Sequence, residues 1–201
     1  MMWKLFTTYP ALTGQKNKAF TLVETLVAIS IFTGSILGLM SVLTQGITNT
    51  NYAKRKIVAS YLAQEGIEYI RNFRDTYVLY SSTSAIGWNT FNSRLTTGSC
   101  GTANGCYFDD SGVVYGNPTL PMTNLSLTAC SGVGGACPEL KYDSTTGKYA
   151  YASGANSGYI RKIIMTTVSA NETKISSTVS WIQGSGSYSI VFSENLFNWV
   201  E

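Results

Sequence analysis

One carboxylate stands alone in an apolar stretch near the start of the sequence. Glu24 is the only charged residue from Phe20 to about Thr44, and most of its neighbours are apolar. About 20 apolar residues suffice to cross a bilayer as a helix, so this stretch is a candidate membrane segment. Insertion scales give a charged side chain in such a segment a cost of roughly 2.5–3.5 kcal/mol, and residues kept there usually have a function. Glu24 is therefore the first candidate functional residue.

The four cysteines form two close pairs, and the chain has no histidine. The pairs are Cys100 with Cys106 and Cys130 with Cys137, and neither has the short spacing of a zinc ribbon. A mixed zinc site would lack its histidine ligands, so we expect disulfides and no bound metal. Four cysteines allow three connectivities, and the sequence does not choose among them. Disulfides indicate an oxidising compartment outside the cytoplasm.

The sequence contains no recognisable catalytic constellation. Histidine, the commonest general base, is absent, and the cysteines are expected to be oxidised. Asp109, Asp110 and Asp143 could contribute to a calcium site, but they lack the ligand spacing of a calcium loop. Ordinary solvated turns explain these aspartates better. We therefore expect no enzyme and no cofactor.

The net charge of +3 arises in the first residues of the chain. Lys4, Lys16 and Lys18 precede Ala19, and no acidic residue does. A cut after Ala19 would remove three of the 14 basic residues and leave eleven against eleven acidic ones, a net charge of zero. Charge therefore does not support nucleic acid as a partner, although a local patch could still contact it. The basic run at 54–56 is explained as well by a solvated helix face as by a contact with lipid phosphates or nucleic acid.

A long helix would carry Glu24. Residues 20–44 form its membrane half, and apolar residues continue at helical spacing through 45–77, which predicts an amphipathic half. The apolar positions are Val58, Leu62, Tyr69, Ile70, Phe73 and Tyr77. Gly34 and Gly38 have the spacing that allows helices to approach closely in lipid, although simple tolerance of glycine is the better explanation.

A β-rich region would carry the cysteines. After Tyr80 the sequence is rich in Ser, Thr, Gly and Asn, and helical periodicity is no longer apparent. Strands are predicted at 106–108, 113–115, 139–143, 148–151, 159–168, 174–182 and 188–192. An antiparallel meander packed on the amphipathic half-helix would bury both apolar faces. The expected fold class is α+β.

The residues around Glu24 resemble the prepilin family, which comprises type IV pilins and the pseudopilins of type II secretion. The resemblance rests on Lys18, Ala19 and the run from Phe20 to Glu24 that leads the apolar helix. It implies that prepilin peptidase cuts between Ala19 and Phe20, and that Phe20 becomes N-methylated. It also implies that Glu24 pairs with the terminal amine of a neighbouring subunit. The family usually has glycine before the cut, where this chain has Ala19.

The resemblance also implies a domain organisation and a function. Residues 1–19 would be the leader, 20–44 the filament-core half of the helix, 45–77 its amphipathic half, and 78–201 an extracytoplasmic domain of type IV pilin-like fold. The chain would be a minor pilin or pseudopilin, held in the cytoplasmic membrane by one span and then assembled into a filament outside it. Its partners would be other pilin subunits, prepilin peptidase and an inner-membrane assembly platform. The alternatives are a major pilin, or a membrane-anchored adhesin or ligand-binding module that does not polymerise.

Overall fold

The computed structural model describes residues 21–110, 113 and 125–198. Ala19 and Phe20, the residues of the predicted cleavage, lie outside this part of the chain, as does most of the strand predicted at 113–115. The chain divides into two compact units between Asn49 and Thr50.

The helix α1 (Leu22–Tyr80) is unbroken by proline and continues across the boundary between the two units. In the first unit, every described residue from Thr21 to Asn49 is exposed. By length and composition, α1 is the one helix in the described residues that could cross a membrane. The prediction of a long apolar N-terminal helix is therefore confirmed.

In the second unit, α1 buries one face against a β-sheet. The predicted apolar positions Leu62, Ile70 and Phe73 are buried, whereas Val58 and Tyr69 are partly buried. Small residues complete the buried face, and they let the helix approach the sheet closely. The buried residues of α1 are Ala59, Leu62, Ala63, Gly66, Ile67, Ile70, Phe73, Arg74 and Thr76.

A second helix, α2 (Ser84–Thr97), was not predicted, and the inference that helical structure ends near Tyr80 is wrong. The hydroxyl of Thr83 accepts a hydrogen bond from the backbone N–H of Ile86, which caps the helix. Trp88, Phe91 and Leu95 repeat at helical spacing and are buried. The Ser, Thr and Asn residues between them obscured this apolar stripe.

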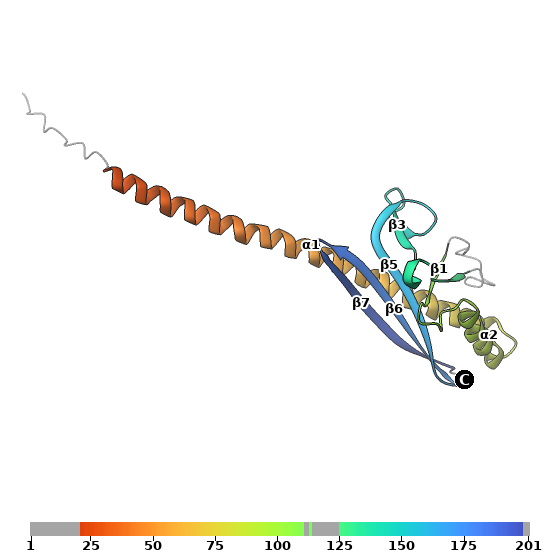
Figure 1. The fold of residues 1–201 in the computed structure, drawn as a ribbon. Helices are drawn as coiled ribbons and strands as arrows, with labels where there is room; N and C mark the ends of the chain where they lie inside the picture. Colours follow the sequence, from red (N-terminus) through yellow and green to blue (C-terminus); the bar gives the residue numbers. More distant parts are fainter. Residues whose placement is uncertain (1–20, 111–112, 114–124, 199–201) are drawn as a thin grey trace, which may run out of the picture. The chain divides into compact units, whose positions relative to one another are not determined.

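The β-sheet is antiparallel, as expected, but it is not a simple meander. The long strand β5 (Ala155–Ser169) pairs with β6 (Glu172–Gln183), which in turn pairs with β7 (Gly186–Phe197). Figure 1 shows these three strands beside the second part of α1. These three strands are consecutive in the sequence and are also adjacent in the sheet.

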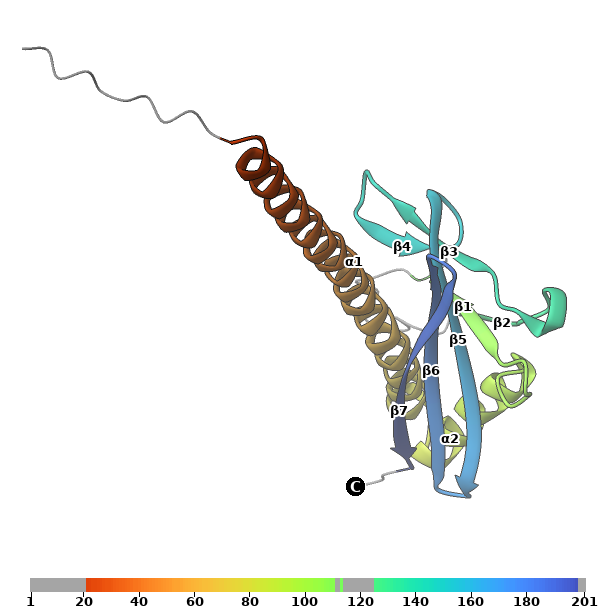
Figure 2. The same cartoon turned by 60° about the vertical axis from the view of Figure 1, so that its left-hand side comes forward.

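Two hairpins share the other edge of β5. One contains β3 (Glu139–Asp143) and β4 (Lys148–Ala150), and the other contains β1 (Cys106–Asp109) and β2 (Ser126–Ala129). β3 and β1 pair with successive parts of β5. The β3–β4 hairpin was predicted, whereas β2 was not. Figure 2 shows the β3–β4 hairpin and the β6–β7 turn at one end of the sheet and α2 at the other.

The core lies between the inward face of the sheet and α1. On β6, the alternate residues Ile175, Ser177, Val179 and Trp181 are buried, while the residues between them are partly exposed, as the predicted alternation requires. Around Phe73, the core extends to the aromatic residues of α2. A second cluster of buried apolar side chains, which includes Leu62 and Trp181, packs around an earlier part of α1.

The cysteines form two local disulfides, Cys100–Cys106 and Cys130–Cys137. Of the three connectivities left open by the sequence, this one closes the two smallest loops, with sequence separations of 6 and 7. All four cysteines are buried. The first disulfide ties the segment after α2 to the start of β1, so it fixes the connection between helix and sheet.

Candidate functional site

Glu24 lies in the first turn of α1. The hydroxyl of Thr21 accepts a hydrogen bond from the backbone N–H of Glu24, with 3.3 Å between oxygen and nitrogen. Thr21 and Glu24 have the Thr-x-x-Glu spacing of a capping box, a signal that the sequence reasoning missed. A carboxylate here also interacts favourably with the positive end of the helix dipole. Glu24 thus has a local role in starting α1, whatever else it contacts.

The carboxylate of Glu24 forms no ion pair with any of residues 21–110, 113 and 125–198. The predicted partner is the amine that cleavage would create on Phe20 of another subunit, and Phe20 is outside the described residues. The pairing of Glu24 therefore stays a prediction.

The first part of α1 presents a continuous apolar surface. Its polar side chains are mostly hydroxyls, and most of these donate hydrogen bonds to backbone carbonyls of the helix itself. Ser35 donates to the carbonyl of Ile31 at 2.8 Å, and Thr44 donates to that of Met40 at 2.9 Å. Hydroxyls satisfied in this way avoid the cost of an unpaired polar group in an apolar medium. The surface is therefore suited to lipid or to the apolar surface of other helices.

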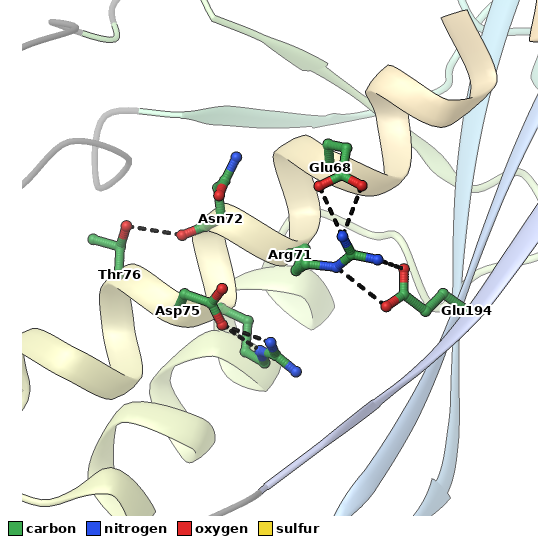
Figure 3. A network of polar contacts seen from close by, with 7 residues as sticks. Glu68, Arg71, Asn72, Asp75, Thr76 and Glu194 are labelled. Carbon is green, nitrogen blue, oxygen red and sulfur yellow. Dashed lines mark hydrogen bonds and ion pairs between the residues drawn. The ribbon is translucent and has the colours of Figure 1, made fainter. Parts of the chain in front are cut away.

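A charged network clamps the second part of α1 to β7. Figure 3 shows the Arg71 guanidinium between two carboxylates, those of Glu68 on the same helix and Glu194 on β7. The closest nitrogen–oxygen distances are 2.7 Å to Glu68 and 2.6 Å to Glu194. The hydrogen bond that Arg71 donates to Glu194 contributes most to raising the pKa of Arg71, which stays charged.

A second, buried contact joins α1 to β5. Arg161 is 3% exposed, and its guanidinium donates to the carboxylate of Glu65 at 2.7 Å. The same guanidinium lies over the ring of Phe108, with 4.0 Å from its carbon to the ring centroid. One signal in the sequence could have indicated this contact, an arginine at an inward position of an alternating strand.

Two of the three aspartates considered for calcium accept hydrogen bonds from side chains or backbone nearby. Asp110 accepts a hydrogen bond of 2.6 Å from the Tyr69 hydroxyl. Asp143 accepts from the backbone N–H of Thr145 at 2.8 Å and from the Thr146 hydroxyl at 3.0 Å. The bond from Thr145 contributes most to lowering the pKa of Asp143. Within the described part of the chain, no group of three or more His, Cys, Asp or Glu residues could hold a metal ion.

Comparison with known proteins does not name this site: no family model, curated protein or solved structure matches the chain.

Proposed function

We propose that this chain is a structural subunit of a filament of the type IV pilus or type II secretion kind, a minor pilin or pseudopilin. The leader would be removed after Ala19, and assembly would proceed through α1. The observation that carries the proposal is the exposed apolar part of α1 with Glu24 in its first turn. A covering of lipid before assembly and of other helices after it would account for that surface.

Glu24 would specify the position of each subunit in the filament. In lipid its charge opposes insertion, and the amine of Phe20 on a neighbouring chain would offset that cost. A helix with uniform apolar contacts could slide along its neighbour, whereas one buried ion pair would select a single register. The disulfide-containing domain supports an extracytoplasmic location for the rest of the chain.

Replacing Glu24 tests assembly directly. We expect Glu24→Val and Glu24→Gln to lower the amount of this subunit in sheared filaments at least tenfold, with its amount in the membrane fraction unchanged. Glu68→Gln is the matched control, because it removes a carboxylate from the same helix outside the apolar part. Normal incorporation of both Glu24 variants would contradict the proposal and favour a membrane-anchored adhesin.

Processing is tested separately by mass spectrometry of the mature amino terminus. We expect N-methylated Phe20 as the first residue. An intact leader, or a cut after Leu43, would contradict the prediction for Ala19 and Phe20.

A further inference from the structure

The second unit has a basic pocket beside the part of α1 with which that unit begins. It has a volume of about 470 Å³. α1 contributes Asn51, Lys54 and Arg55, and the sheet contributes Ser157 from β5 and Gln183 from β6. All of these residues belong to the same compact unit. The pocket thus combines two cations with amide and hydroxyl groups that can donate hydrogen bonds.

Neither cation is neutralised within the described residues. Lys54 forms no ion pair there, and Arg55 donates only to a backbone carbonyl, that of Ile182, at 3.2 Å. The carboxylate of Glu139 accepts a hydrogen bond from the backbone N–H of Gly158, which lies next to Arg55, and it keeps its own negative charge. Lys54 and Arg55 against Glu139 leave one net positive charge at the pocket, which an anion would neutralise.

The other polar side chains of the pocket add no negative charge. The side-chain oxygen of Gln183 is buried and has no hydrogen-bond partner in the described part of the chain. Tyr149 and Tyr159 line the remaining wall, and burial raises the pKa of both phenols above the ordinary value of 10.0. They therefore stay neutral and add no negative charge.

The pocket follows the apolar segment closely in the chain. Lys54 comes only seven residues after Ile47 in the sequence, so a short stretch of chain joins the cations to the apolar segment. Helical side chains lean toward the N-terminus, and long cationic side chains extend toward the lipid headgroups. A membrane that contains the preceding segment would therefore place phosphate groups within reach of Lys54 and Arg55.

The same end of the domain is rich in aromatic side chains, as membrane interfaces commonly are. Tyr52 packs against Trp181 and against Tyr188, whose ring stacks on that of Trp181. Ile182, beside them, is 69% exposed. Cations together with aromatic and apolar side chains fit a bilayer surface better than they fit bulk water.

We infer that this pocket binds the phosphate of an anionic phospholipid in the membrane that holds the apolar part of α1. The bound headgroup fixes the second unit against the membrane surface. The inference rests on membrane insertion of α1 and does not require assembly into a filament.

Native mass spectrometry of the full chain in detergent micelles tests the inference. The probes are phosphatidylglycerol and phosphatidylcholine added in equal amounts. We expect phosphatidylglycerol to be retained preferentially, and Arg55→Gln to weaken its binding about fivefold, the typical contribution of one basic residue at an anionic membrane surface. Lys54→Gln should act in the same direction, and it removes no hydrogen bond within the described residues.

Lys56→Gln is the matched control, because it removes the same charge from the next residue of α1 and does not line the pocket. We expect it to change binding less than twofold. If Lys56→Gln and Arg55→Gln weaken phosphatidylglycerol binding equally, the pocket is not the binding site and the lipid is attracted by positive charge in general. Equal retention of the two lipids would also overturn the inference.

Two other occupants would be recognised by the same experiment. Inorganic phosphate that binds with the same dependence on Arg55, without any preference for phosphatidylglycerol, would overturn the lipid assignment. Dimers lost on Arg55→Gln in place of lipid adducts would assign the pocket to a second copy of the chain. Because Glu24→Val should retain the lipid, failure of this inference is distinguishable from failure of filament assembly.

Discussion

The two parts of α1 have the same backbone conformation and opposite burial. From Leu22 to Asn49 every residue is exposed, whereas from Ala59 to Thr76 one face is buried against the sheet. The first part is mostly apolar and carries no charge except Glu24, whereas the second has an apolar stripe with charges on the remaining surface. Helix formation alone therefore does not decide what a segment packs against, since the distribution of apolar residues around the axis does so.

Glycine shows the same contrast at single-residue scale. A Cβ atom added at Gly34 or Gly38 would meet no atom within 4 Å. One added at Gly66 would overlap the Ser177 hydroxyl and lie 3.1 Å from Ile163 Cδ1. The space beside Gly34 and Gly38 is empty in this structure, whereas the sheet fills the space beside Gly66.

Truncating a phenylalanine in each part should give the largest difference. Phe73 is fully buried, so Phe73→Ala should lower the free energy of unfolding by about 3–5 kcal/mol. Phe32 is 65% exposed, so Phe32→Ala should leave the unfolding of the disulfide-containing domain unchanged. Denaturant titration of the full chain in detergent, followed by near-ultraviolet circular dichroism, measures both. Similar losses for the two variants would contradict the assigned difference in burial.

Adding a methyl group in each part should give an intermediate difference. Gly66→Ala should destabilise the domain by about 1–3 kcal/mol, because the sheet must move away. Gly38→Ala meets no described neighbour and should be neutral or should stabilise the helix by up to about 1 kcal/mol. The same titration reports both effects. A harmless Gly66→Ala would mean that α1 and β6 are not in close contact.

Removing the charged clamp should give the smallest effect. The Arg71 side chain is 37% exposed, so solvent screens its ion pairs, and Arg71→Gln should cost about 1 kcal/mol or less. The loss should shrink as salt rises toward 1 M. Lys56→Gln serves as the control, because Lys56 forms no ion pair in the described residues. A large loss that does not depend on salt would show that Arg71 acts through packing.

Patterns with a strong period could be predicted from the sequence. The apolar run before Thr44 and the alternation of Val179 and Trp181 each fit one element only, and both elements are present. The helix α2 was missed because polar residues surround its apolar stripe, which consists of only three large side chains. These are Trp88, Phe91 and Leu95. The stability of α2 comes from packing against Phe73, which no local pattern indicates.

The sequence by itself determined that a long apolar helix begins near Glu24 and leads to an antiparallel β region with paired cysteines, because helical and strand periods are local properties. Only the tertiary structure decided which cysteines pair, that Arg161 meets Glu65, and that Lys54 and Arg55 share a pocket with Gln183. The ion pair and the pocket join residues that are distant in the chain, and each disulfide selects one of several possible cysteine partners. Their selection depends on how α1 and the strands pack, which spacing along the sequence does not specify.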